Sequence, residues 1–248
     1  MHQLRCSEVW GGIQNEDLDA RSAMVTASLY SGACDGGKGG DIYYYSVCQM
    51  DKLTRIAVAD VVGHGEKVST VSQWIYESLR KRMNGGEGCE LLSELNALAC
   101  ERGLEALTTA SVASFYKPLS KLCFAYAGHP PLLFRRRAAG HWQPLPLAKG
   151  RSGPANLPLG ITPDMRYEQE TVSIAAGDRL LFYTDGVLEA PGAAGGLFGK
   201  ERLLQVLEEV GSRELHEVKT AVLTALRDYV GGELRHDDVT LLAIEVRE

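Results

Sequence analysis

Residues 177–186 read GDRLLFYTDG and contain the most continuous apolar run of the chain, between a glycine turn and an aspartate. The run from Arg179 to Thr184 is short and apolar at successive positions, a pattern typical of a strand that is buried on both faces. Such a strand crosses the core and delivers the Asp185 carboxylate at its far end. A carboxylate in that place is costly unless its charge is used. Asp185 is therefore the acid that is hardest to explain as purely structural.

Three other segments also place an aspartate where a strand pattern meets a turn. They are GGD at residues 39–41, ADVVGHG at residues 59–65 and DDVT at residues 237–240. If a sheet brings these carboxylates together with Asp185, they form a hard oxygen site suited to divalent cations such as Mg²⁺ or Mn²⁺. The adjacent acids Asp237 and Asp238 point in opposite directions in an extended chain, so at most one of them faces such a site.

Each of these acids also has a simpler interpretation. Asp41 follows two glycines and fits an ordinary turn aspartate. Asp60 precedes a predicted helix and could serve as its N-cap. His64 lies between Gly63 and Gly65, which would expose its imidazole beside the Asp60 carboxylate, although a lone histidine in a turn is often incidental.

The remaining pattern predicts an α+β domain. Strands are expected at residues 23–31, 42–50, 53–62, 110–116, 122–127, 179–184 and 239–246, the second and third of them joined by a turn at Asp51-Lys52. Another strand begins at residues 131–135, and residues 138–164 are expected to be loops with short strands. Apolar residues at helical spacing predict helix pairs over residues 66–83 and 88–104 and over residues 203–210 and 215–230. Blocks of strands alternating with helix pairs indicate layered antiparallel sheets, not a parallel βαβ sheet. The absence of an internal repeat or a long linker favours one domain spanning residues 1–248.

Composition excludes several classes of protein. A net charge of −6 in 248 residues argues against a general nucleic-acid binder, which would carry a basic surface. No apolar run approaches the roughly 20 residues that cross a bilayer, and the first ten residues resemble no signal peptide. The cytoplasm is therefore the expected location. The six cysteines include no C-x-x-C pair, so reduced and mostly buried thiols are expected.

The ordered set of motifs resembles the SpoIIE-type branch of the metal-dependent protein phosphatase (PPM) superfamily. Besides the four acidic segments, the similarity includes AGHPPLL at residues 127–133, LPLGI at 157–161, GDRLLFYTDG at 177–186 and FGKERL at 198–203. It extends from about Ser28 to Val246. Each motif alone is weak, whereas their common order is specific.

The resemblance implies two central antiparallel sheets between helix pairs, with two Mn²⁺ or Mg²⁺ ions at one edge. By motif, Asp41 and Asp60 would be ligands, together with the backbone carbonyl of Val61, while Asp185 and Asp237 would hold the second ion. Two such ions lower the pKa of a shared water and clamp phosphate oxygens during in-line attack. His64 is the candidate for protonating the leaving serine or threonine oxygen.

The implied function is a phosphoserine/phosphothreonine protein phosphatase acting on a small regulatory protein, such as an anti-sigma-factor antagonist. Regulation would come from a separate sensor or regulator protein, with no nucleic acid or membrane partner. A catalytically silent pseudophosphatase that binds phosphoproteins and a hydrolase of small phosphoesters are the alternatives. The chain departs from the family at Tyr44, where many relatives have a second acid, and at Tyr126, where asparagine is common. No arginine falls in an obvious phosphate-gripping motif.

Overall fold

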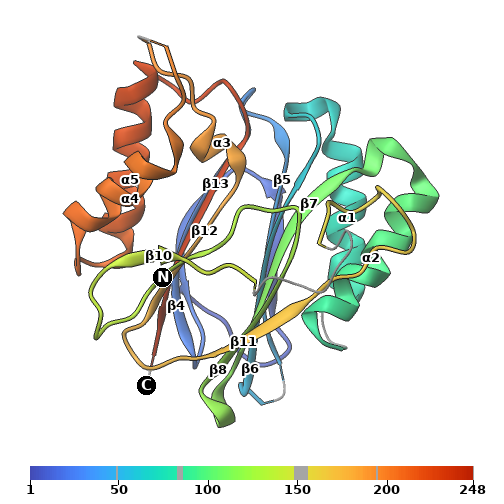
Figure 1. The fold of residues 1–248 in the computed structure, drawn as a ribbon, viewed down its shortest axis with the longest axis horizontal. Helices are drawn as coiled ribbons and strands as arrows, with labels where there is room; N and C mark the ends of the chain where they lie inside the picture. The colour runs from blue at the N-terminus through green and yellow to red at the C-terminus, as the bar shows by residue number, and fades with distance from the viewer. Residues whose placement is uncertain (49, 83–85, 148–155, 194, 248) are drawn as a thin grey trace.

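The computed structural model describes residues 1–48, 50–82, 86–147, 156–193 and 195–247. Two β-sheets pack face to face, and a pair of helices covers the outer face of each sheet (Figure 1). This four-layer α+β arrangement is the one predicted from the alternation of strand blocks and helix pairs.

The first sheet has seven strands in the described part of the chain, and β13 and β12 lie near its centre. Neighbouring strands are antiparallel, apart from the short β1, which runs parallel to β3 and departs from the purely antiparallel expectation. In spatial order the strands are β1 (His2–Gln3), β3 (Glu16–Arg21), β4 (Val25–Gly32), β13 (Val239–Val246), β12 (Arg179–Tyr183), β9 (Leu133–Arg135) and β10 (Trp142–Pro144).

The second sheet is antiparallel and has six strands within the described residues. The turn between β5 and β6 contains the predicted Asp51 and Lys52 and also Met50, which was expected to end the strand; Met50 and Asp51 both have positive φ. In spatial order the strands are β11 (Gln169–Ser173), β8 (Lys121–Ala127), β7 (Thr108–Tyr116), β6 (Leu53–Val61), β5 (Lys38–Cys48) and β2 (Val9–Gln14).

The helices form the two outer layers. On the right of Figure 1, α1 (Ser69–Arg82) and α2 (Gly88–Arg102) cover the second sheet; on the left, α4 (Gly199–Val210) and α5 (Leu215–Val230) cover the first. The one-turn helix α3 (Asp185–Leu188) follows β12 at the upper end of the sandwich. Short 3₁₀ turns η1 (Gly65–Lys67), η2 (Leu104–Ala106) and η3 (Lys117–Leu119) complete the described helical segments.

Three apolar clusters fill the spaces between these four layers. Alternation along β5 illustrates the arrangement: Tyr43 and Tyr45 point between the sheets, while Ile42 and Tyr44 point toward α1 and α2. The third cluster packs β12 and β13 against α4 and α5. Because side chains alternate along a strand, Asp41 shares the inner face of the sandwich with Tyr43 and Tyr45.

The structure confirms most predicted elements and corrects a few. All five residues of β12 are buried, as expected of a strand inside the core. Strand β5 begins at Lys38, so Gly39 and Gly40 belong to the strand and not to the preceding turn. Helix α1 begins at Ser69, after η1, and not directly after Gly65. Strands β1, β2, β3 and β11 were not predicted.

The cysteine expectation is only partly correct. All six thiols are free, as predicted. None of them is fully buried, however: Cys6 is exposed and the other five are half-buried, so the expectation of mostly buried thiols is wrong.

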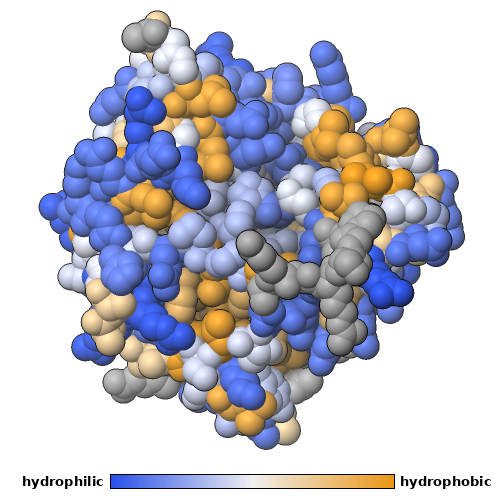
Figure 2. All heavy atoms as spheres, viewed as in Figure 1, coloured by the Kyte–Doolittle hydropathy of each residue, from blue (hydrophilic) through white to orange (hydrophobic). Residues whose placement is uncertain are grey.

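Hydrophobic groups are unevenly distributed on the surface. Figure 2 shows several separate hydrophobic groups on this face, at the upper right, at the upper left and along the lower middle. Among the exposed large hydrophobic residues are Leu104 in η2 and Ile161, which are 82% and 47% exposed. Within the described residues no helix combines the length and the apolar character needed to cross a membrane.

Candidate metal centre

The site begins with two acids that face each other across a strand pair. In the register of β5 and β6, Asp41 lies directly opposite Asp60. This is the end pair between the two strands. Both side chains lie on the inner face, because Asp41 alternates with Ile42 and Asp60 alternates with Ala59. Directly opposed like charges destabilise a sheet. The arrangement therefore favours a cation or a proton between these two carboxylates.

Asp41 is the more deeply buried of the two and is 3% exposed. Thr184, which follows β12 in the other sheet, donates a hydrogen bond from its Oγ1 to Asp41 Oδ2 at 2.8 Å. Burial raises the pKa of Asp41 well above its usual value, and the nearby Asp238 and Asp185 carboxylates add to that rise. The Thr184 hydroxyl opposes the rise but does not cancel it.

The other three candidate acids form one electrostatic group with Asp41. Burial raises the pKa of Asp60, and the charges of Asp41, Asp185, Asp237 and Asp238 raise it further. The pKa values of Asp185 and Asp237 are also raised, chiefly by burial, and the charge of Asp185 contributes to the rise at Asp237. The folded chain thus gathers carboxylates that disfavour each other's ionisation.

Asp238 differs from its neighbour Asp237 because backbone donors satisfy its carboxylate. Its Oδ1 accepts the Cys34 N–H at 2.8 Å, its Oδ2 accepts the Gly40 N–H at 2.6 Å, and both oxygens lie within 3.3 Å of the Gly65 nitrogen. Asp238 is 2% exposed, whereas Asp237 is half-buried. Asp238 therefore ties the β4–β5 loop, the start of β5 and η1 to the start of β13. This leaves Asp237 as the candidate ligand of the pair.

A glycine brings the Val61 carbonyl close to the start of β5. A Cβ atom at Gly40 would lie 2.9 Å from the backbone oxygens of both Val61 and Gly63. Gly186, after β12, similarly lies against the Asp238 carbonyl, where a Cβ would come within 2.0 Å. The glycines beside Asp41 and Asp185 thus permit close backbone contact at the site end of each sheet, between the start of β5 and the end of β6 and between α3 and the residue before β13.

His64 lies in the turn between β6 and η1 and is exposed. Its Nδ1 is 3.2 Å from the Sγ of Cys34, a contact between the β4–β5 loop and η1. The positive φ values of Gly63 and Gly65 allow the tight turn that presents the imidazole at the surface. The proton-donor role of His64 remains a prediction.

Two other positions in the family motifs, His129 and Tyr44, do not belong to the acid group. His129 is buried, and its Nδ1 lies 2.9 Å from the Thr109 hydroxyl, on the residue paired with Asp60 across β6 and β7. Burial lowers the pKa of His129 to about 4, so the ring is neutral. Tyr44 points into the α1–α2 layer and packs near Tyr76, with ring centroids 6.5 Å apart. It therefore does not join the acid group.

The donor chemistry of the group fits hard divalent cations. Asp41, Asp60, Asp185 and Asp237 supply carboxylate oxygens, and the Val61 carbonyl adds a neutral oxygen. No described set of three or more His, Cys, Asp or Glu side chains is already arranged around a single point. The fit therefore rests on the mutual electrostatics of the carboxylates and on the Asp41–Asp60 register.

Sequence reasoning missed two residues that organise this end of the sandwich, Thr184 and Cys34, and it named Asp238 without its positioning role. Thr184 links Asp41 to the first sheet, and its Oγ1 also accepts the Thr240 N–H at 3.0 Å. Cys34 contacts His64, and Asp238 has the positioning role described above. The threonines directly before Asp185 and shortly after Asp238 were the available signal, because a hydroxyl at a buried strand end needs a polar partner.

Comparison with curated proteins finds two relatives in Bacillus subtilis (strain 168). The chain is 26% identical over 234 residues to the phosphoserine phosphatase RsbU, covering 93% of this chain and 64% of that protein. It is 24% identical over 220 residues to the phosphoserine phosphatase RsbP, covering 84% of this chain and 49% of that protein. The chain thus spans 64% of the length of RsbU and about half, 49%, of the length of RsbP.

Solved structures share the fold. The RsbU and RsbW domains of a Mycobacterium tuberculosis protein superpose with a TM-score of 0.77 at 23% identity, covering 95% of this chain and 62% of that chain. The SiaA-PP2C domain of Pseudomonas aeruginosa gives a TM-score of 0.75 at 22% identity, covering 88% of this chain and 85% of that chain. The family model for Stage II sporulation protein E (SpoIIE) matches residues 50–247. The chain therefore belongs to the SpoIIE family and has the fold of PP2C-type phosphatase domains.

Proposed function

We propose that this chain is a Mg²⁺- or Mn²⁺-dependent protein phosphatase that hydrolyses phosphoserine or phosphothreonine. The observation that carries the proposal is the directly opposed pair Asp41 and Asp60 on the inner face, joined electrostatically to Asp185 and Asp237. Such a group of acids destabilises a fold that makes no use of it, and it suits a cation-dependent site.

In this proposal two ions occupy the group. Asp41, Asp60 and the Val61 carbonyl would hold one ion, and Asp185 and Asp237 the other, with Asp60 as the bridge. When bound, the ions lower the pKa of a water and neutralise charge on the phosphoryl oxygens. Asp238 keeps the three backbone segments around the acids in place. His64, exposed beside the group, would donate the proton to the departing seryl or threonyl oxygen.

The proposed substrate is a small phosphorylated regulatory protein, such as an anti-sigma-factor antagonist, with a separate sensor or regulator protein controlling the activity. The support is the similarity to RsbU and RsbP, both named phosphoserine phosphatases. Both relatives are longer than this chain, so the similarity says nothing about how this chain is regulated. Regulation by a separate partner is part of the proposal alone.

The test is hydrolysis of an aryl phosphate and of a phosphoserine peptide with Mn²⁺, with Mg²⁺ and with a chelator. Activity is expected only with metal. Asp185→Asn should lower kcat/KM by about 10³-fold or more, since metal-assisted stabilisation of the transition state is worth several kcal/mol. Asp164→Asn, which changes an exposed acid, is the matched control and should retain activity.

Three outcomes would redirect the proposal. Activity that survives the chelator or the Asp185→Asn change contradicts the metal site. Tight binding of the phosphopeptide without turnover of either substrate favours the pseudophosphatase. Turnover of small phosphoesters alone, with no activity on phosphoserine peptides, favours a small-molecule hydrolase.

A further inference from the structure

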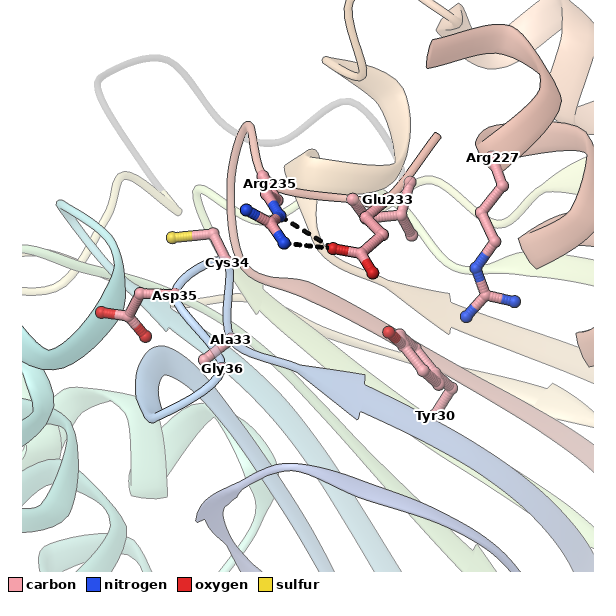
Figure 3. A pocket seen from close by; sticks show the side chains of 9 residues that line it. Tyr30, Ala33, Cys34, Asp35, Gly36, Arg227, Glu233 and Arg235 are labelled. Atoms are coloured by element: carbon pink, nitrogen blue, oxygen red, sulfur yellow. Dashed lines mark hydrogen bonds and ion pairs between the residues drawn. The ribbon is translucent and has the colours of Figure 1, made fainter. Parts of the chain in front are cut away.

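A cavity of about 400 Å³ lies beside the acid group, between the β4–β5 loop, the end of α5 and the segment before β13. Figure 3 shows the side chains of Tyr30, Arg227, Glu233 and Arg235 around this space. The cavity is not part of the metal centre proposed above, although the two share a wall.

Two residues that line the cavity are linked through the backbone to Asp237 and Asp238. Cys34 lines the cavity, and its N–H binds Asp238. Arg235 precedes Asp237 by two residues, so their Cα atoms are at most about 7 Å apart. A peptide whose phosphoserine lies at the acids can therefore reach the cavity with a residue about two to four positions away.

Asp35 also lines the cavity, but its carboxylate is turned toward η1. In Figure 3 the Asp35 side chain points away from Arg227 and Arg235. Its carboxylate accepts the Gly37 N–H at 3.0 Å and the Glu66 N–H at 2.8 Å, on the side of η1. Asp35 therefore stabilises the loop and leaves the interior of the cavity to the other charged groups.

Two further guanidinium groups and one further carboxylate line the cavity. Arg235 donates to Glu233 at 2.8 Å through Nε, in a pair whose side chains are both 76% exposed. Arg227 lies over the Tyr30 ring, 5.9 Å from its centroid, and within the described part of the chain its guanidinium has no ion pair or hydrogen bond. The exposed Glu233–Arg235 pair contributes little stability, so an incoming anion can replace it at small cost.

We infer that this cavity binds an acidic side chain of the phosphoprotein substrate, near the phosphorylated residue, with Arg227 as its main partner. The inference rests on the proposed phosphatase function and names a determinant of its substrate choice. The planar guanidinium of the exposed Arg227 matches a carboxylate, and the Tyr30 ring lies against it. The sequence showed no arginine in an obvious phosphate-gripping motif, and Arg227 of α5 would contact a neighbouring acidic side chain of the substrate and not its phosphate.

The experiment uses phosphoserine peptides with an otherwise neutral sequence. Each peptide carries one glutamate at one position between −4 and +4, counted from the phosphoserine, and a matched peptide carries glutamine at the same position. For at least one position, kcat/KM for the glutamate peptide should exceed that for the glutamine peptide by about 5-fold, the size expected of a partly exposed charge pair. Arg227→Glu should abolish or reverse this ratio. Arg80→Glu, the same change at an exposed arginine of α1, should preserve it.

Equal ratios in the wild-type protein and in Arg227→Glu, or a wild-type ratio near one at every position, would overturn the inference. Failure of the proposed function is distinguishable, because it would show as no turnover of any peptide. In that case fluorescence anisotropy with the labelled glutamate and glutamine peptides, in the presence of a chelator, gives the same comparison from binding alone. Weaker binding of the glutamate peptide to Arg227→Glu than to Arg80→Glu supports the proposed role of the cavity, and equal binding refutes that role.

Discussion

The two sheets bring acids to the same end of the sandwich in different ways. The β5–β6 pair supplies Asp41 and Asp60 from within paired strands, where the register forces two like charges to face each other. The β12–β13 pair supplies Asp185, Asp237 and Asp238 from the residues just outside the strands. There the backbone can turn to satisfy one carboxylate, that of Asp238, with three N–H groups.

This difference separates buried acids that stabilise the fold from those that do not. A carboxylate with several backbone donors repays its desolvation, whereas one opposed by another carboxylate does not. The acids that the fold fails to satisfy are therefore the ones to test for function.

The largest effect on stability is expected when the Asp238 carboxylate, just before β13, is removed. Asp238→Ala removes the acceptor of three backbone N–H groups, two of them buried, and should lower the free energy of unfolding by about 3–5 kcal/mol. Asp237→Ala, at the adjacent residue, should change it by less than about 1 kcal/mol, because its carboxylate lacks those three partners. Urea denaturation in the presence of a chelator measures both. Equal losses in the two variants would show that Asp238 has no special positioning role.

The second prediction tests His64, in the turn after β6, as the proposed proton donor. His64→Gln should reduce kcat for a phosphoserine peptide by about 100-fold, the lower end of general acid–base contributions. The reduction for an aryl phosphate should be much smaller, because an aryl oxide departs without a proton donor. Ratios of the two rates in wild-type protein and variant provide the measurement. A uniform reduction for both substrates would assign His64 a role in binding or folding instead.

The smallest effect concerns His129, the neutral buried group beside the β5–β6 pair. Its folded-state pKa of about 4 lies below the usual 6.5, so the unfolded chain takes up a proton first as the pH falls. Stability is thus fully present above pH 6.5 and is lost toward pH 4, with about 2 kcal/mol lost between pH 7 and pH 5. His129→Asn should flatten this part of the pH profile of unfolding, while His141→Asn, at an exposed histidine, should not. An unchanged profile in His129→Asn would place the acid sensitivity elsewhere.

Strands buried on both faces were readable from the sequence, and edge strands were not. The apolar run ending at Tyr183 predicted β12, because a central strand needs apolar residues on both sides. Strand β3 reads EDLDAR and β11 reads QETVS, and both lie near sheet edges, where one face meets water. Their polar composition therefore concealed them.

For the candidate site, the sequence by itself determined the acids. Asp41, Asp60, Asp185 and the Asp237-Asp238 pair were recognisable because carboxylates rarely end apolar strands without a use. Their order along the chain also determined the family resemblance.

Only the tertiary structure decided how these acids divide their roles. The register of β5 on β6 set Asp41 against Asp60, and three backbone segments far apart in sequence converged on Asp238. The same folding brought Arg227 of α5 next to Tyr30, in the wall of a cavity that Cys34 also lines. Spacing along the chain cannot reveal such contacts, because they depend on which strands pair and how the layers pack.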